Sequence, residues 1–103
     1  MRSLAYLKAC RADLKEIAAY IAEESGSIAT SRRFVAALRG QCEKIARLST
    51  KLGRPRDDLR PGIRTFAFKR YVLVLRYEGD RLEIVNIIHG ARDIEALFRG
   101  GEP

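Results

Sequence analysis

The stretch that decides the fold runs from Ile63 to His89 and reads IRTFAFKRYVLVLRYEGDRLEIVNIIH. It contains three runs rich in β-branched and aromatic residues, which are typical of strands. These runs are Ile63 to Phe68, Tyr71 to Tyr77, and Leu82 to His89. The middle run is unbroken from Val72 to Leu75, as expected for a strand that is buried on both faces. Gly79-Asp80 follows it, and a glycine in the first central position suits a type II′ hairpin turn. The stretch therefore predicts a three-stranded antiparallel meander.

Two helical patterns precede this meander. The first places its apolar residues at i, i+3, i+4 and i+7, on one helix face: Leu14, Ile17, Ala18 and Ile21. We expect this helix to run from about Cys10 to Glu24, with Ser25-Gly26 ending it. Ser27 is a candidate N-cap for a second helix. The apolar stripe of that helix is Phe34, Leu38, Cys42, Ile45 and Leu48. So short a link between the helices predicts an antiparallel hairpin.

The rest of the chain completes an α+β domain. Residues Ser3 to Lys8 are expected to form a short strand in the same sheet, and residues 49–62 to form a loop punctuated by Pro55 and Pro61. Residues 92–98 are expected to form a short helix or turn, and residues 99–103 a frayed tail. The predicted order is β-α-α-β-β-β, with a mainly antiparallel sheet, a helical hairpin against one face and a short C-terminal helix, in one domain spanning residues 1–103.

Charge and composition narrow the classes of partner. The 103-residue chain has a formal net charge of +7 and a pI near 9.9, and the window from Arg47 to Arg64 holds six basic residues against Asp57 and Asp58. This balance favours contact with an acidic partner. The two cysteines lack metal-type spacing, and no apolar run approaches a membrane span. We therefore expect a cytoplasmic protein that has no metal, no cofactor and no membrane contact.

Several segments carry a resemblance to a known family. Residues 57–64 (DDLRPGIR), residues 69–73 (KRYVL) with Arg76-Tyr77, and residues 82–94 (LEIVNIIHGARDI) resemble the corresponding segments of ParE toxins. The first helix, with Ala12-Asp13-Leu14 and Tyr20-Ile21, is also similar. The likeness extends from about Leu4 to Phe98. In order and spacing, the chain resembles ParE toxins of the RelE/ParE superfamily.

This resemblance implies a toxin of a type II toxin–antitoxin system. Such toxins form hetero-oligomers with an acidic, partly disordered ParD-like antitoxin, and they meet DNA only indirectly, through the antitoxin. ParE toxins are associated with DNA gyrase, whereas RelE relatives of the same fold cut mRNA on the ribosome. A third alternative is a member whose activity is lost or redirected and which acts mainly in a DNA-bound autoregulatory complex. Fold alone does not choose between them.

The residue types speak against the ribonuclease alternative. Cleaving RNA through its 2′-OH requires a base, an acid and cations for the phosphate. By the resemblance, the lysine positions of RelE-like ribonucleases fall at about Ile63 and Thr65, the position after the strand tyrosine is Val72, and the late tyrosine is Phe98. Only Arg92 of the expected set is retained, although Arg64 lies close by in the sequence. We therefore expect no catalytic residues and no enzymatic activity.

His89 is the single histidine, and no Cys, Ser or carboxylate partner stands at a recognisable spacing from it. We expect it to hydrogen-bond the turn at the end of its strand.

Two groups of candidate binding residues follow. The candidates for contact with the target lie after the last strand: Arg92, Asp93, Ile94, Leu97 and Phe98. They combine charge with an apolar patch, as binding hot spots do. Two alternatives stay open, namely that Arg92 and Asp93 form an ion pair closing the last turn, and that Ile94 and Leu97 merely cap the core. The candidates for contact with the antitoxin are basic: Arg56, Arg60, Arg64 and Arg76.

Overall fold

The computed structural model describes residues 2–99, so the predicted tail at residues 100–103 lies outside the described residues. The elements in chain order are β1 (Ser3–Tyr6), α1 (Lys8–Ser25), α2 (Ile28–Arg47), β2 (Arg54–Pro55), β3 (Ile63–Phe68), β4 (Tyr71–Glu78), β5 (Arg81–His89) and α3 (Ile94–Arg99). The predicted α+β order is confirmed, with one additional short strand, β2. Arg99, which was expected in the frayed tail, is instead the last residue of α3.

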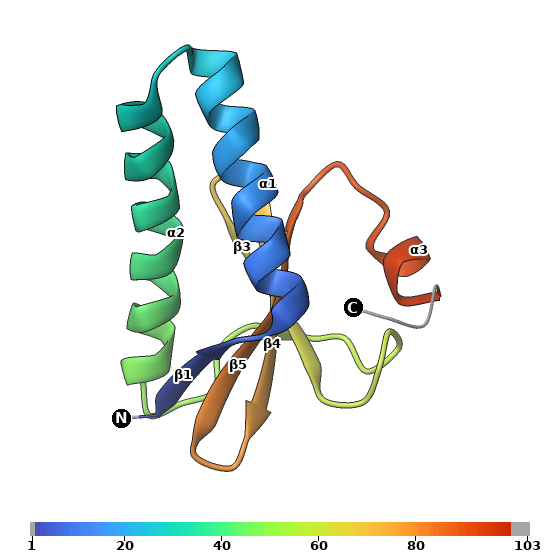
Figure 1. Ribbon diagram of the computed structural model, residues 1–103. Helices are drawn as coiled ribbons and strands as arrows, with labels where there is room; N and C mark the ends of the chain where they lie inside the picture. The colour runs from blue at the N-terminus through green and yellow to red at the C-terminus, as the bar shows by residue number, and fades with distance from the viewer. Residues whose placement is uncertain (1, 100–103) are drawn as a thin grey trace.

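The sheet has five strands in the order β1-β5-β4-β3-β2. The meander β3-β4-β5 is antiparallel, as predicted, and β1 joins the same sheet by pairing in parallel with β5. A parallel pair needs a long crossover connection. Here the connection includes the helical hairpin, whose two helices stand side by side in Figure 1. Glu78 pairs with Arg81 across the last turn, where Gly79 has a φ of 56°, as the predicted hairpin requires.

The link between the two helices lies where the sequence predicts, but α1 begins at Lys8, two residues before the expected start and inside the segment that was expected to be strand. Gly26 follows α1 with a φ of 67°, in the left-handed conformation that ends helices. The hydroxyl of Ser27 accepts a hydrogen bond from the Thr30 N–H at 3.1 Å and so caps α2. Ser31 is buried and donates to the Ala18 carbonyl at 2.6 Å, which joins the two helices. Leu48 was expected in the apolar stripe, but it lies just past the end of α2 and is 43% exposed.

The two faces of the sheet carry separate apolar clusters. The helix-covered face holds the larger cluster, which includes Cys10, Leu38, Cys42, Leu73 and Leu75. The opposite face holds a smaller cluster formed by Ile63, Val74, Val85 and Phe98. The two cysteines, Cys10 and Cys42, are free and buried.

The alternation of side chains between the two faces of the sheet is interrupted within β5. Val74 pairs with Asn86, whereas its neighbour Leu75 pairs with Ile84, so Val85 is an extra residue. Because of this β-bulge, Leu82 and Ile84 are followed on the helix-covered face by Ile87 and not by Asn86. Asn86 pairs with Val74, and its side-chain amide donates to Asp13 of α1 at 2.9 Å.

The strand β2 was not predicted, because residues 49–62 were expected to be loop. Arg54 pairs with Thr65 and Pro55 with Arg64, which adds β2 to the edge of the sheet beside β3. Proline has no backbone N–H and is tolerated in an edge strand of this kind. Two residues are too few to show an alternating pattern in the sequence.

Candidate functional site

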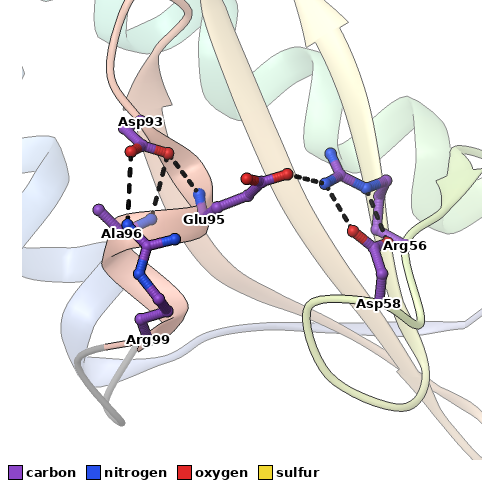
Figure 2. A network of polar contacts seen from close by, with 6 residues as sticks. All are labelled: Arg56, Asp58, Asp93, Glu95, Ala96 and Arg99. Carbon is purple, nitrogen blue, oxygen red and sulfur yellow. Dashed lines mark hydrogen bonds and ion pairs between the residues drawn. The ribbon is translucent and has the colours of Figure 1, made fainter.

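The predicted target-binding segment forms a capped helix. The Asp93 carboxylate accepts hydrogen bonds from the N–H groups of Glu95 (3.0 Å) and Ala96 (3.2 Å), which caps α3, and it lies 3.7 Å from the Arg99 guanidinium (Figure 2). Arg92 uses its backbone N–H to close the turn onto the His89 carbonyl at 2.9 Å. Within residues 2–99, Asp93 therefore pairs with Arg99 and not with Arg92, so the proposed Arg92–Asp93 ion pair is wrong.

The apolar residues of this segment face inward. Phe98 is only 7% exposed and belongs to the smaller core cluster with Ile63, Val74 and Val85, while Ile94 and Leu97 pack against that cluster. This packing agrees with the alternative in which Ile94 and Leu97 cap the core. The sheet face away from the hairpin has no other helix among the described residues, so α3 supplies the apolar cover that this face needs.

Two of the predicted antitoxin-binding arginines join the loop before β3 to α3. The Arg56 guanidinium lies 2.8 Å from Asp58 and 3.5 Å from Glu95 of α3 (Figure 2). The Arg60 guanidinium lies 5.2 Å from the centre of the Phe98 ring, in a cation–π contact. The hydrogen bond from Arg56 lowers the pKa of the Asp58 carboxyl, so this pair stays ionised at neutral pH.

The other two arginines lie on opposite faces of the sheet. Arg64 pairs across the ladder with Leu75 of the larger cluster, whereas Arg76 pairs with Ile63 of the smaller one. Arg64 donates to the Gly53 carbonyl at 2.9 Å. The four candidate arginines therefore do not form one patch, although Arg56 and Arg60 lie together at α3.

Arg76 takes part in a buried ionic network with Glu83. The Glu83 carboxylate is 3% exposed and accepts hydrogen bonds from Arg76 (2.9 Å) and from Arg81. Burial alone would raise the pKa of Glu83, but the hydrogen bonds and charges of the two arginines outweigh it and lower that pKa. The Arg76 guanidinium therefore already has a partner within the chain.

A groove between α1 and the end of β5 was not predicted. It has a volume of about 290 Å³ and is lined by Asp13, Glu16, Ile17, Tyr20, Tyr71, Ile87, Ile88, His89 and Arg92. Asp13 is anchored there, because its carboxylate accepts from the Ile87 N–H at 3.0 Å as well as from Asn86. The sequence held a signal for this role, since Asp13 stands four residues before Ile17 in the apolar stripe of α1.

The aromatic floor of the groove continues into a second hollow. Tyr20, Tyr71 and His89 line both, and the second hollow, of about 240 Å³, adds Phe34, Lys69 and Arg70. The His89 ring stands edge-on to Tyr71 with centroids 5.4 Å apart, and its Nδ1 accepts from the Ala91 N–H at 3.1 Å. The prediction that His89 hydrogen-bonds its turn is confirmed. Arg92 lies with this groove and not with the smaller cluster that buries Phe98.

The thiols of this chain are poorly suited to nucleophilic chemistry. Burial raises the pKa of Cys10 to about 12 and that of Cys42 to about 11, so both stay protonated at neutral pH. Within residues 2–99, no group of three or more His, Cys, Asp or Glu side chains is arranged to hold a metal ion. No helix in that same range is long and apolar enough to span a bilayer.

This architecture is shared with a solved toxin–antitoxin structure. A chain of the chromosomal ParDE TA system from P. aeruginosa superimposes with a TM-score of 0.76 at 23% sequence identity, covering 86% of this chain and 96% of that one. At that identity the likeness establishes the fold. Toxin ParE3 of Caulobacter vibrioides is 41% identical over 46 residues, which are 45% of this chain and 46% of that relative, so the match spans about half of each.

The family assignment rests on a match that extends over most of the chain. The family model for the ParE toxin of the type II toxin-antitoxin system, parDE, matches residues 4–94. The match runs from β1 to the first residue of α3, so it includes the complete sheet and the helical hairpin. The chain therefore belongs to the ParE toxin family of type II toxin–antitoxin systems.

Proposed function

We propose that the chain arrests growth in the cytoplasm by inhibiting DNA gyrase, and that a ParD-like acidic antitoxin neutralises it. The observation that carries this proposal is the family match over residues 4–94. The net charge of +7 supports an acidic partner, because complementary charge speeds encounter and suppresses wrong partners.

The burial of two positions supports inhibition by binding over RNA cleavage. Ile63 and Phe98 stand where RelE-like ribonucleases have a lysine and a tyrosine. They are 1% and 7% exposed and both belong to the smaller cluster. Arg92, the one retained residue, lines the groove beside α1 on the helix-covered side. These positions hold no side chain that can transfer a proton to or from a ribose.

We place the target contact on the segment from Arg92 to Phe98, with its members in different roles. Arg92 and Asp93 are exposed and available for direct contact. Ile94 and Leu97 are half-buried, and with Phe98 they hold α3 against the sheet. In this proposal the apolar residues fix the position of the helix, and the charged residues recognise the target.

We also assign part of the antitoxin contact to the basic candidates. Arg56 and Arg60 lie at α3, so an acidic segment bound to them would pass over the target-binding segment. Arg64 and Arg76 each have a partner inside the chain and would contribute charge more than new hydrogen bonds.

Expression of the chain alone, followed by growth measurements and primer extension on cellular mRNA, tests this function. We expect growth arrest without specific mRNA cleavage, and rescue by co-expression of an acidic open reading frame found immediately upstream. Arg92→Ala should weaken the arrest, whereas Arg32→Ala, which removes an exposed charge from α2, should leave it. Specific cleavage that disappears in Arg92→Ala would support the ribonuclease alternative. A chain that arrests nothing would favour a purely regulatory role.

A further inference from the structure

The second hollow, between the helical hairpin and the β3–β4 turn, is lined by rings and cations. Its lining residues are Tyr20, Ile21, Phe34, Lys69, Arg70, Tyr71 and His89. Among the described residues, no carboxylate lines this hollow, whereas Asp13 and Glu16 line the adjoining groove. All the formal charge in the lining of the second hollow is therefore positive, and this charge favours an anionic ligand.

The rings of this hollow rest on a rigid support. Tyr71 is 7% exposed, and its ring packs against those of Phe34 and His89, with centroids 5.5 and 5.4 Å apart. Tyr20 stands on the α1 side with 56% of its surface exposed. Exposed aromatic rings of this kind are platforms on which nucleobases stack. The volume of about 240 Å³ is sufficient for a base, since an apolar cavity of about 150 Å³ holds benzene.

His89 presents a hydrogen-bond donor beside these rings. Its Nδ1 accepts from the Ala91 N–H at 3.1 Å, so the neutral imidazole carries its proton on Nε2. The side chain is exposed, and no group within residues 2–99 accepts a hydrogen bond from Nε2. Stacked bases are recognised through hydrogen bonds at their edges, which a donor in this position can supply.

The two cations stand together in the turn between β3 and β4. Lys69 and Arg70 are exposed, and the Arg70 guanidinium has no hydrogen bond or ion pair among the described residues. The Gly90 N–H donates to the Arg70 carbonyl at 2.8 Å, which fastens the turn to the end of β5. A planar arginine fork beside a lysine point charge is a combination that binds phosphate.

The backbone at Lys69 adds an independent indication. Its φ of 57° lies in the left-handed region, which L-residues rarely adopt and glycine adopts without steric cost. Strained non-glycine residues of this kind gather at ligand-binding sites. A lysine held in this conformation beside the hollow is explained if its side chain binds a ligand.

We propose that the second hollow binds a nucleotide, with the base against Tyr20 and His89 and the phosphate at Lys69 and Arg70. Two adjacent cations match the charge of about −2 on a phosphate monoester better than the single charge of a carboxylate. The nucleotide is either free in solution or part of a single-stranded nucleic acid. The site is independent of the proposed function, because neither gyrase nor an antitoxin takes part in it.

Titration of the purified chain with adenosine 5′-monophosphate, followed by amide NMR, tests the site. We expect saturable binding with a Kd of about 1 mM or lower, with the largest shift changes at Arg70, Tyr71 and His89. Adenosine, which lacks the phosphate, and inorganic phosphate, which lacks the base, should each bind more weakly by about tenfold or more. A single-stranded oligodeoxyadenylate of about ten nucleotides distinguishes the two sources. Tighter binding per nucleotide than the monophosphate supports a nucleic-acid strand, and weaker binding supports a free nucleotide.

Matched variants locate the binding. Arg70→Glu should weaken binding of the monophosphate by about tenfold or more, whereas Arg32→Glu, an exposed charge on α2 outside the hollow, should leave it unchanged. Tyr20→Ala should weaken binding by about fivefold or more, and Tyr20→Phe, which keeps the ring, should bind like the wild type.

Three results would overturn the proposal. The first is the absence of saturable binding up to about 10 mM monophosphate. The second is equal binding of adenosine, or of the peptide acetyl-Phe-Glu-amide, which offers a ring and a carboxylate in place of a base and a phosphate. The third is a set of shift changes confined to residues 51–64, since it would show attraction to the basic loop and not to the hollow.

Discussion

The Arg60 guanidinium lies over the Phe98 ring, 5.2 Å from its centre, and so joins the loop before β3 to α3. Arg56 makes a second link between the same two elements through Glu95, at 3.5 Å. These contacts lie above the smaller apolar cluster, which Phe98 completes. The last helix is therefore part of the folded core.

Replacing Phe98 should cost substantial stability. Phe98→Ala removes a buried ring from the cluster of Ile63, Val74 and Val85, and core substitutions of this type cost about 3–5 kcal/mol. Because Phe98 keeps 7% of its surface exposed, we expect a loss near 3 kcal/mol in urea unfolding. Phe98→Leu, which retains apolar volume, should lose less than half of that. A loss below about 0.5 kcal/mol for Phe98→Ala would show that α3 is not part of the core.

Removing residues 92–103 is consequently a poor test of where toxicity resides. The deletion would uncover Ile63, Val74 and Val85 and remove the Arg56–Glu95 pair, so loss of toxicity would follow from unfolding alone. Surface substitutions such as Arg92→Ala separate recognition from stability, because Arg92 is exposed.

The buried carboxylate of Glu83 should make stability depend on pH. Its pKa is lowered in the folded state, so its contribution is fully present above the unfolded-state value near 4.5 and is lost as the pH falls through the lower folded value. Wild-type stability should therefore decrease between about pH 5 and pH 3. Glu83→Gln should lower stability at pH 7 by about 1–3 kcal/mol and flatten this part of the profile. If the free energy of unfolding of Glu83→Gln fell with decreasing pH as steeply as that of the wild type, this assignment to Glu83 would be contradicted.

The turn between β3 and β4 holds a non-glycine residue in a left-handed conformation. Lys69 has a φ of 57°, which costs an L-residue about 1–2 kcal/mol relative to right-handed backbone. Lys69→Gly should remove this strain and raise the free energy of unfolding by up to about 1 kcal/mol. Arg70→Gly, at the adjacent position without positive φ, should be destabilising by about 0.5–1 kcal/mol. Equal effects of the two substitutions would mean that the strain is absent.

Much of the fold follows from residue patterns. The spacing of Leu14 and Ile17 and the unbroken run from Val72 to Leu75 depend only on local periodicity, and so the helices and the meander were predicted. The strand β2 and the bulge at Val85 were not predicted, because each is a matter of pairing between distant segments. Local sequence carries no signal for a two-residue strand.

The candidate site was less predictable than the fold. Arg92 to Phe98 was recognised as a distinct segment, but whether Ile94 and Leu97 face solvent or the core depends on the far face of the sheet, which no local pattern reports. The groove beside α1 depends on where β1 stops relative to β5, and hence on register. The assignments to target and antitoxin stay predictions.

Charge should control how quickly the partner is captured. With a net charge of +7, the chain should attract an acidic antitoxin over distances comparable to the Debye length, about 10 Å at 0.1 M salt. Raising salt from about 50 mM to 500 mM should slow association by tenfold or more and change dissociation little. Stopped-flow mixing measures both rates. An association rate that does not respond to ionic strength would rule out steering by charge.

The most direct test of the proposed function is supercoiling of relaxed plasmid by purified DNA gyrase in the presence of increasing amounts of the purified chain. We predict that supercoiling is inhibited in proportion to the chain added, that Arg92→Ala inhibits less than wild type, and that pre-mixing with the acidic antitoxin restores activity. Full supercoiling at a large molar excess of folded wild-type chain would contradict the claim that this toxin acts on gyrase.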